Sequence, residues 1–345
     1  MTLALLTTPF HARTAEHNSF NAWVERGGFT MPAHFGEPNG EALAARFSAV
    51  LADITPTADV RIHGEGAAAL LAAACRSDVE TLAAGHSRSV HWCADGGGLR
   101  GMGTVARFGA DNFLLRGFEA DFGWFAAAAP RFRANLREAT TDRGLLLLAG
   151  PFAFAVLAAA GLEQVVRLSA GEHQICGWQG VTVTVFRHGP LNAYQVSCAN
   201  RDGPAVFDRL FRAGRLFGVR LAGELALDLL QVESGIVVPG RDFTPARTPF
   251  AREPLPASVG VGDAIGAPLV LAGIDFDSDA PAPFARVCVR KADVGRTMRS
   301  LYSPALKRAI ALASIAPAHA APGTAVTVIT AGEETAGRIV ALPFL

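Results

Sequence analysis

The chain has little of what marks several large classes of protein. Lysine plus arginine and aspartate plus glutamate number 31 each, so the formal net charge is zero and no basic face is offered to nucleic acid or to a membrane surface. The five cysteines are widely spaced and form no CxxC pair, which argues against a zinc or disulfide framework and favours a reducing compartment. We therefore expect a cytoplasmic protein that holds no metal and has no nucleic-acid or membrane partner.

Long hydrophobic runs are also scarce. The apolar run at the N-terminus has no basic residues before it, and we expect no signal peptide there. Residues 145–162 (LLLLAGPFAFAVLAAAGL) are about long enough to span a bilayer. Gly150-Pro151 interrupts this run, however, and the leucines before it are of strand length. The stretch therefore predicts a strand, a turn and a buried helix rather than a membrane span.

Half of the residues are apolar, and 345 residues are too many for one core, so two or three domains are expected. The order β-α-β-β-β-α in the first half indicates an α+β fold. Residues 239–268 are rich in Pro, Gly and Arg and predict an irregular segment between domains, while the residues after about 265 are strand-patterned, as in a β-barrel. Apolar spacing predicts helices over residues 41–54, from about 65, over 204–214 and over 222–235, and strands over 60–64, 89–109, 112–117 and 180–186.

A predicted hairpin raises the question of function. The strand GVTVTVF (180–186) leads into RHGPLNAYQV (187–196), in which a Gly-Pro-Leu-Asn turn precedes a second strand. This frame resembles R-T-G-Y-T-G-E-D-G-Y-E-I of the glycine-cleavage T-protein family, in which polar turn residues hold a pterin. Five further stretches are similar to motifs of that family in the same order: GGFTMPAHFG (27–36), HWCADGGG (91–98), LLLLAGP (145–151), ALDLLQVESG (226–235) and VGRTMRSLYSPALKRAIALASI (294–315).

The resemblance covers most of the chain and implies a fold. Members of this family form a three-domain cloverleaf, in which two α+β domains and a C-terminal β-barrel-like module surround a central channel. The first α+β domain would comprise residues 1–50 with 145–255, the second residues 51–144, and the β-rich domain residues 265–345. The resemblance also implies one-carbon chemistry, with folate entering the channel from one face and the donor from the other.

The positions that recognise folate in this family are changed here. Where the family carries two acids after a glycine turn, this chain has Arg100 and Gly101. An arginine cannot act as a carboxylate base, but its forked N–H groups can hold an anionic oxygen; a solvated turn arginine is the alternative. The hairpin glutamate that pairs with the pterin corresponds to Leu191, and two basic helix positions become Leu227 and Gln231. Each unpaired pterin donor would cost about 1–3 kcal/mol.

We take Arg100, Tyr194 and Glu233 as candidate catalytic residues. The Tyr194 hydroxyl can serve general acid–base work, although a structural strand aromatic fits as well. For Glu233, at the end of a predicted helix, a catalytic and a structural role are equally open. The histidines His34, His91 and His188 can act as bases or be satisfied structural residues. Candidate substrate-binding residues are Met31, His34, Trp92, His188, Gln195 and Asp228, of which Asp228 is better explained by a structural ion pair.

The changed positions indicate a more apolar channel that recognises folate less well. We interpret the chain as an enzyme that removes a one-carbon unit from a small, aromatic or apolar donor. It would be a formaldehyde-releasing lyase without a cofactor, or else a tetrahydrofolate-dependent demethylase or aminomethyltransferase; a non-catalytic binding protein is the third alternative. Self-association stays open. In the lyase, Arg100 and Tyr194 should reach one cavity bounded by the Met31-Pro32 loop and the hairpin.

Overall fold

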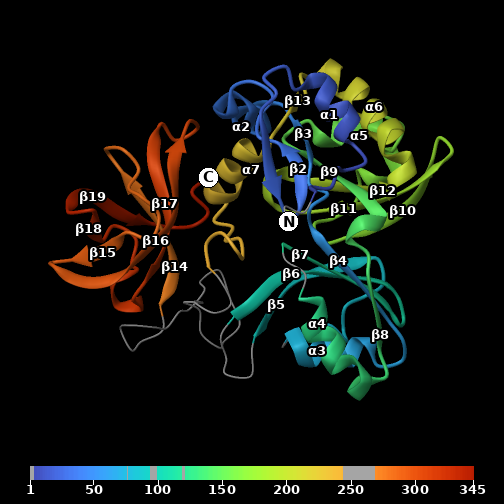
Figure 1. The fold of residues 1–345 in the computed structure, drawn as a ribbon, viewed down its shortest axis with the longest axis horizontal. Coiled ribbons are helices and arrows are strands. Elements are labelled where there is room, and N and C mark those ends of the chain that lie inside the picture. The colour runs from blue at the N-terminus through green and yellow to red at the C-terminus, as the bar shows by residue number, and fades with distance from the viewer. Residues whose placement is uncertain (1–3, 76, 94–98, 119–120, 244–268) are drawn as a thin grey trace. The chain divides into compact units, whose positions relative to one another are not determined.

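The computed structural model describes residues 4–75, 77–93, 99–118, 121–243 and 269–345. The chain divides into two compact units (Figure 1). Unit 1 comprises Met1–Val90 and Gly103–Leu227, and unit 2 comprises His91–Met102 and Asp228–Leu345. Most of the predicted irregular segment 239–268, and the glycine turn at 94–98, lie outside the described residues.

A six-stranded sheet of order β10-β11-β12-β9-β3-β13 forms the larger part of unit 1. Its strands pair antiparallel except β13, which is parallel to β3. The strands are β3 (Val50–Asp53), β9 (Arg143–Ala149), β10 (His173–Trp178), β11 (Val181–Arg187), β12 (Tyr194–Ala199) and β13 (Arg220–Leu221). Helices α1 (His11–His17), α2 (Pro38–Phe47), α5 (Ala153–Ala159) and α6 (Gly203–Gly214) accompany this sheet, with the hairpin β1 (Trp23–Arg26) and β2 (Phe29–Pro32).

Helix α6 shows why these residues fold as they do. Pro204 stands in its first turn, where a missing N–H costs nothing. Val206, Phe207 and Leu210 recur at helical spacing and are buried. They join α5 and strands β9 and β12 in one apolar core, so the sheet has a packed face under these helices.

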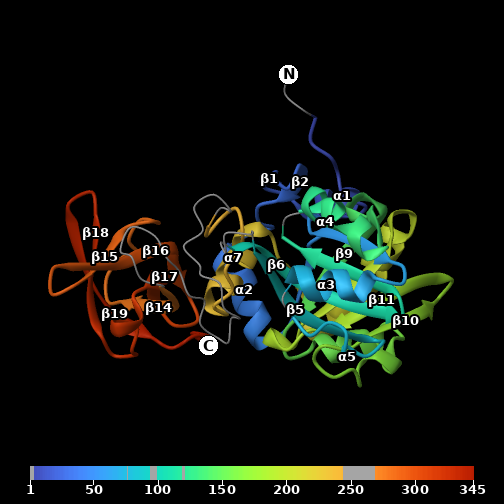
Figure 2. The same cartoon turned by 90° about the horizontal axis from the view of Figure 1, so that it is seen from below.

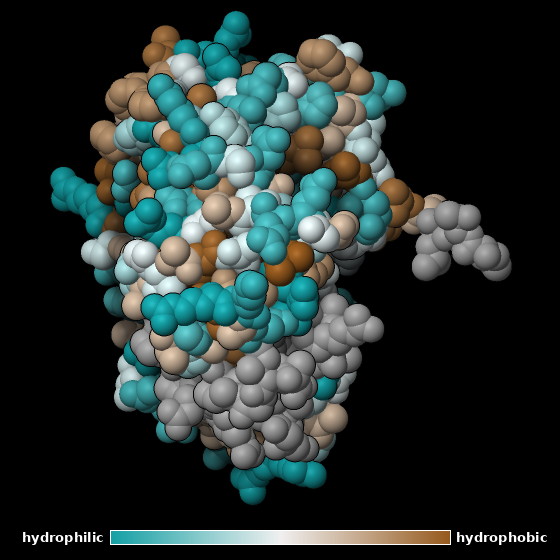
Figure 3. All heavy atoms as spheres, turned by 90° about the vertical axis from the view of Figure 1, so that its left-hand side faces the viewer, coloured by the Kyte–Doolittle hydropathy of each residue, from teal (hydrophilic) through white to brown (hydrophobic). Residues whose placement is uncertain are grey.

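The long apolar run 145–162 folds as predicted. Strand β9 ends at Ala149, Gly150 takes φ 128°, and α5 begins at Ala153. A Cβ on Gly150 would stand 2.6 Å from the Ser48 carbonyl oxygen, so only glycine fits this turn. No helix in the described part of the chain is long and apolar enough to cross a membrane. The face drawn in Figure 3 mixes hydrophilic and hydrophobic residues.

One predicted helix is wrong in its second half. The helix expected over 41–54 ends at Phe47, and the strand β3 begins at Val50. Ser48 breaks the helix, because its backbone is non-helical and its Oγ donates to the carbonyls of Phe217 and Gly218. Since β3 lies between β9 and β13 and is buried throughout, its residues form a continuous apolar run that spacing alone does not distinguish from a helix.

A five-stranded sheet of order β5-β6-β7-β4-β8 forms the second layer. The predicted β-α-β-β-β-α order is confirmed, with one further strand, β8. Helices α3 (Ala67–Cys75) and α4 (Phe122–Ala128) lie along this sheet (Figures 1 and 2). The strands are β4 (Ala58–His63), β5 (His86–Cys93), β6 (Leu99–Gly109), β7 (Asn112–Gly117) and β8 (Asn135–Glu138).

The two sheets of unit 1 meet through a small apolar cluster. Ala106 and Leu114 of the five-stranded sheet pack with Phe186 of β11, and Phe108 joins them. The division of this part into two α+β domains, residues 1–50 with 145–255 and residues 51–144, stays a proposal; β3 (Val50–Asp53) and the start of β9 lie across the expected boundaries.

Unit 2 contains a closed barrel of order β14-β17-β16-β15-β18-β19, which confirms the predicted β-rich module. Its core is formed by small and branched side chains such as Ile274, Val287, Ala311 and Val328. Helix α7 (Glu224–Glu233) passes from unit 1 into unit 2. The barrel strands are β14 (Val270–Phe276), β15 (Arg286–Val289), β16 (Ala292–Ser303), β17 (Arg308–Ile315), β18 (Ala325–Thr330) and β19 (Glu333–Val340).

Candidate functional site

The hairpin between β11 and β12 closes on itself. Its turn holds Leu191 and Asn192 in the left-handed region, with φ 54° and 49°. Arg187 donates from Nη2 to Asn192 Oδ1 at 3.0 Å and from Nη1 to the Ala193 carbonyl at 3.2 Å, and it also donates to the His188 carbonyl. The polar side chain of this turn is therefore engaged within the hairpin, and no acid stands where the family has its glutamate.

Two candidate residues of β12 point to opposite faces of the sheet, as neighbours on a strand must. Tyr194 is 3% exposed and lies in the apolar core, with the Arg187 guanidinium 4.7 Å from its ring centroid. Gln195 lies on the other side and accepts a hydrogen bond from Arg116. The core position of Tyr194 agrees with a structural role, and its catalytic role stays a prediction.

Gln195 is one end of a buried polar chain. Arg116 Nη1 donates to Gln195 Oε1 at 2.9 Å, while its Nε and Nη2 donate to the Asp59 carboxylate at 2.8 and 2.9 Å. Arg143 also donates to Asp59. Burial opposes the charged form of Asp59, but the two guanidinium groups outweigh it and hold the pKa of this carboxyl below its usual range.

His188 follows Arg187 at the start of the turn. Burial, reinforced by the charges of Arg116 and Arg187 and opposed by Gln195, lowers the pKa of His188 to about 4. Its Nε2 is buried and has no hydrogen-bond partner in the described part of the chain. His188 is thus neutral near pH 7, with a ring nitrogen that no protein group occupies.

The remaining histidine and methionine candidates of unit 1 lie by β2. Met31 is 1% exposed and, with Pro32, belongs to that strand rather than to the predicted loop. It borders a cavity of about 10 Å³, which holds at most one water molecule. His34 contacts the ring of Phe20 at 5.6 Å between centroids, and its Nδ1 is buried without a partner among the described residues.

In unit 2, the segment that replaces the family's acidic pair is packed around an indole. Trp92 of β5 is 2% exposed. A Cβ added to Gly101 of β6 would stand 2.4 Å from Cζ2 and 2.6 Å from Cε2 of Trp92. Trp92 therefore occupies the volume in which a side chain at position 101 would begin. Arg100, the preceding residue, is partly buried.

Asp228, in the middle of α7, is bound by two arginines of unit 2. Asp228 forms ion pairs with Arg241 and, at 3.4 Å, with Arg299, as the sequence interpretation favoured. Arg299 also donates to Gln231 at 2.9 Å and to both carboxylate oxygens of Asp242 at 2.8 Å. No pattern in the sequence singles out this arginine.

Glu233 lies deeper in unit 2. It is 1% exposed and accepts a hydrogen bond from Ser303 Oγ at 2.6 Å. A buried acid with such a partner agrees with a structural role, and the catalytic role of Glu233 stays a prediction. Since Arg100 belongs to unit 2 and Tyr194 to unit 1, the expectation that both reach one cavity also stays a prediction.

Sequence reasoning missed the chain formed by Asp59, Arg116 and Arg143. The available signal was the presence of charged residues within apolar strands, Asp59 and Arg61 in ADVRIH and Arg116 in NFLLRG. Buried charges are rare unless paired, so each predicts an unseen partner. The pairing itself joins strands far apart in sequence. In the described part of the chain, no three His, Cys, Asp or Glu side chains are grouped as a metal site requires.

Comparison with known proteins gives consistent matches along the whole chain. The GCVT N-terminal domain model matches residues 10–253, and the glycine cleavage T-protein C-terminal barrel domain model matches residues 269–345. The glycine cleavage system aminomethyltransferase T from Bartonella henselae superposes with a TM-score of 0.84 at 21% identity, over 99% of this chain and 98% of that one. This likeness shows the fold.

Two relatives have different activities. An aminomethyltransferase of Saccharopolyspora erythraea is 28% identical and is matched over 98% of this chain and 97% of its own length. A trimethylamine-oxide aldolase of Ruegeria pomeroyi is also 28% identical, over 93% of this chain but 44% of its own length. The chain thus spans less than half of that aldolase.

Proposed function

Because this chain belongs to the glycine cleavage T-protein family, we propose that it removes a one-carbon unit from a small donor and releases it as formaldehyde, without tetrahydrofolate. Its named relatives are enzymes of one-carbon transfer or lyase type, and the chain is an enzyme of that broad class. The finer assignment, to a lyase acting on an aromatic or apolar donor, is the proposal.

The observation that carries the proposal is the contact between Trp92 and Gly101. The resemblance places a folate-recognising acid at position 101, but the indole fills the space that its Cβ and carboxylate need. The loss of the acid at position 101 is therefore matched by the position of Trp92, whose ring takes up the space beside Gly101. A pterin that met this segment would lose its acidic partner, and an indole would be in its place.

The hairpin supports the same conclusion independently. Asn192 is held by Arg187, and Leu191 offers no acceptor to a pterin. Gln195 is linked through Arg116 to the buried acid Asp59. The charge of Asp59 is already neutralised by Arg116 and Arg143, so this acid cannot serve a pterin. Donor groups of a pterin would remain unpaired here, at a cost of about 1–3 kcal/mol each.

The proposed reaction is a retro-aldol cleavage of a donor R–CH2–OH. A base takes the hydroxyl proton, the carbon–carbon bond breaks, and formaldehyde leaves. The bonding electron pair passes to R, which then takes up a proton to give R–H. An aromatic or conjugated R is needed because it can spread the negative charge.

We assign the proton-accepting role to His188. It is neutral near pH 7 and its Nε2 is unoccupied by any described protein group. The Arg187 guanidinium, whose charge helps to lower the pKa of His188, would stabilise negative charge on the donor, since Arg116 is already paired with Asp59. Arg100 remains proposed as a holder of an anionic oxygen.

A tetrahydrofolate-dependent aminomethyltransferase or demethylase is the second candidate. The observation in its favour is that the relative matched over nearly its whole length is an aminomethyltransferase, whereas the aldolase is matched over less than half.

The test is a turnover assay with and without tetrahydrofolate, on small hydroxymethyl aromatic donors for the lyase reaction and on methoxy and N-methyl donors for the folate-dependent one. Formaldehyde released without folate supports the lyase, and product formed only with folate establishes the transferase. The variant His188→Gln should lower the lyase rate by about 100-fold, the scale typical of lost general-base catalysis. The matched control His63→Gln changes an exposed histidine of β4 and should retain activity.

A further inference from the structure

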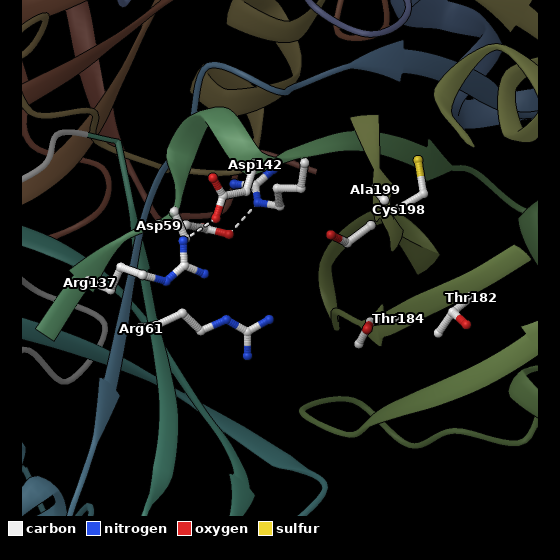
Figure 4. Close-up of a pocket in the computed structure, with 11 residues that line it drawn as sticks. Asp59, Arg61, Arg137, Asp142, Thr182, Thr184, Cys198 and Ala199 are labelled. Atoms are coloured by element: carbon white, nitrogen blue, oxygen red, sulfur yellow. Dashed lines mark hydrogen bonds and ion pairs between the residues drawn. The ribbon is translucent and has the colours of Figure 1, made fainter. Parts of the chain in front are cut away.

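Unit 1 contains a cavity of about 200 Å³ that the proposed reaction does not use (Figure 4). It opens between strands β4 and β8 of the five-stranded sheet and strands β9, β11 and β12 of the six-stranded sheet. One wall carries Arg61 and Arg137 and the other carries Thr182 and Thr184 (Figure 4), and Arg143 and Ser197 also line the cavity.

The cavity carries an excess of positive charge. Its two acids are already engaged, since Asp59 binds Arg116 and Arg143, and Asp142 binds Arg137. Arg61 has no carboxylate within 4 Å in the described part of the chain. Its guanidinium carbon lies 4.8 Å from the centroid of the Phe108 ring.

Arg61 and Arg137 also stand directly opposite each other on β4 and β8. Like charges in facing positions of a sheet are destabilising unless a counter-charge lies between them. Figure 4 shows the Arg61 guanidinium directed into the space between the two walls. Asp142 supplies a counter-charge to Arg137, whereas Arg61 forms no ion pair of its own with a described residue.

One buried hydrogen-bond donor of the cavity, Nη1 of Arg143, has no acceptor among the described residues. Arg143 is 8% exposed and its Nε and Nη2 are bonded, but its Nη1 is buried with no hydrogen-bond partner among the described residues. Thr182, Thr184 and Ser197 also line the cavity, and their hydroxyls can donate hydrogen bonds to a bound acceptor. A buried unpaired donor is costly and indicates an acceptor supplied from outside the chain.

We propose that this cavity binds a small oxyanion, the carboxylate or phosphate group of a low-mass ligand. Forked N–H groups of arginine match two oxygens of such a group, and the threonine and serine hydroxyls can donate to the others. The volume is below the roughly 300–1,000 Å³ of pockets for drug-sized ligands, so the bound molecule is small. All of these residues belong to unit 1, and the proposal does not depend on the one-carbon reaction.

Isothermal titration calorimetry with acetate, succinate and inorganic phosphate, at constant ionic strength made up with chloride, tests the proposal. We expect saturable binding of at least one probe. The variant Arg61→Gln should weaken it by about 10-fold or more, as expected for a lost hydrogen bond to a charged group. Thr184→Val, which keeps the branched shape and removes the hydroxyl, should weaken it by a smaller factor. Binding of the carboxylates alone or of phosphate alone identifies the ligand class.

The matched control is Arg131→Gln, which removes an exposed arginine outside the cavity and should bind as the parent does. Circular dichroism establishes that each variant folds. If Arg61→Gln does not fold, Arg61→Lys takes its place, because it keeps the positive charge and removes the paired N–H groups of the guanidinium. The proposal would be overturned if the heat of injection of every probe equalled that of a control titration with chloride. Unchanged binding in a folded Arg61→Gln or Arg61→Lys variant, together with unchanged binding in Thr184→Val, would overturn it as well.

Discussion

Asp59 and Arg116 stand directly opposite each other on neighbouring antiparallel strands, and the guanidinium donates two hydrogen bonds to the carboxylate at 2.8 and 2.9 Å. Both residues are nearly fully buried, and the pair carries the Gln195 contact between the two sheets. The pair therefore fixes how the sheets of unit 1 face each other at this point.

Asp59→Asn should lower the free energy of unfolding by about 3–5 kcal/mol, because it leaves two buried guanidinium groups without their shared carboxylate. Urea denaturation measures the change. Glu16→Gln, which removes the acid of an exposed pair with Arg13, is the control and should cost less than about 1 kcal/mol. Equal effects of the two substitutions would contradict a structural role for the buried pair.

Gly101→Ala tests the packing of the indole. Its Cβ would meet Trp92 at 2.4 Å, so the strand or the ring must move, and we expect destabilisation of about 1–3 kcal/mol. Gly109→Ala on the same strand has no atom within 4 Å of its new Cβ and should be neutral or slightly stabilising. Thermal unfolding and the fluorescence of Trp92 report the two outcomes. An unshifted melting temperature in Gly101→Ala would remove the main support for the loss of the folate acid.

His188 makes stability depend on pH in a defined window. Its pKa is about 4 when folded and 6.5 in the unfolded chain, so between these values the unfolded chain binds more protons. Stability should therefore fall as the pH is lowered from 6.5 to 4, by at most about 3 kcal/mol from this residue.

The variant His188→Gln should make that part of the profile less steep, and His173, whose pKa burial also lowers to about 4, accounts for the slope that remains. Asp53 acts in the opposite sense, because burial raises its pKa, and the difference between the variant and the parent isolates the histidine. Denaturant unfolding at a series of pH values measures both curves. Parallel curves for the variant and the parent would show that His188 titrates normally.

Tetrahydrofolate should bind weakly. If each of the three changed positions, Gly101, Leu191 and Leu227, costs about 1 kcal/mol, affinity falls by roughly 100-fold or more. Calorimetry with reduced folate measures it, and Leu191→Glu, which restores one acid, should tighten binding. Micromolar binding to the unchanged chain, with folate-dependent turnover, would restore the transferase assignment.

Asp228→Asn should destabilise unit 2, since Arg241 and Arg299 lose a charged partner, by about 1.5–3 kcal/mol. Turnover per folded molecule should not change if the residue is structural. Asp293→Asn removes the acid of a half-exposed pair with Arg296 and provides the control. A large loss of turnover with little loss of stability would instead assign Asp228 to substrate binding, as first predicted.

Local signals in the sequence predicted much of the fold. Gly150-Pro151 separates a strand from a helix because the turn needs a backbone conformation that only glycine takes easily, and that information is local. The prediction was wrong for residues 48–53, which were expected to continue the helix. A strand that is buried on both faces has no alternating pattern of apolar and polar residues, so its apolar run looks like more of the preceding helix.

The candidate site was less accessible to such reasoning. Tyr194 and Gln195 were both assigned to it, although neighbours on a strand face opposite sides, and the structure places Tyr194 in a core. The partner of Asp59 lies 57 residues away and could not be named from spacing. Likewise, the contact of Trp92 with Gly101 depends on how β5 and β6 come together.

The closure of the barrel in unit 2 has a consequence for aggregation. Because β14 pairs with both β17 and β19, the barrel leaves no strand edge unpaired. The two sheets of unit 1 are open and end at β10, β13, β5 and β8. Open edges can recruit strands from other molecules, and closed ones cannot. When this protein is stressed, intermolecular strand pairing should therefore start in unit 1 and spare the barrel.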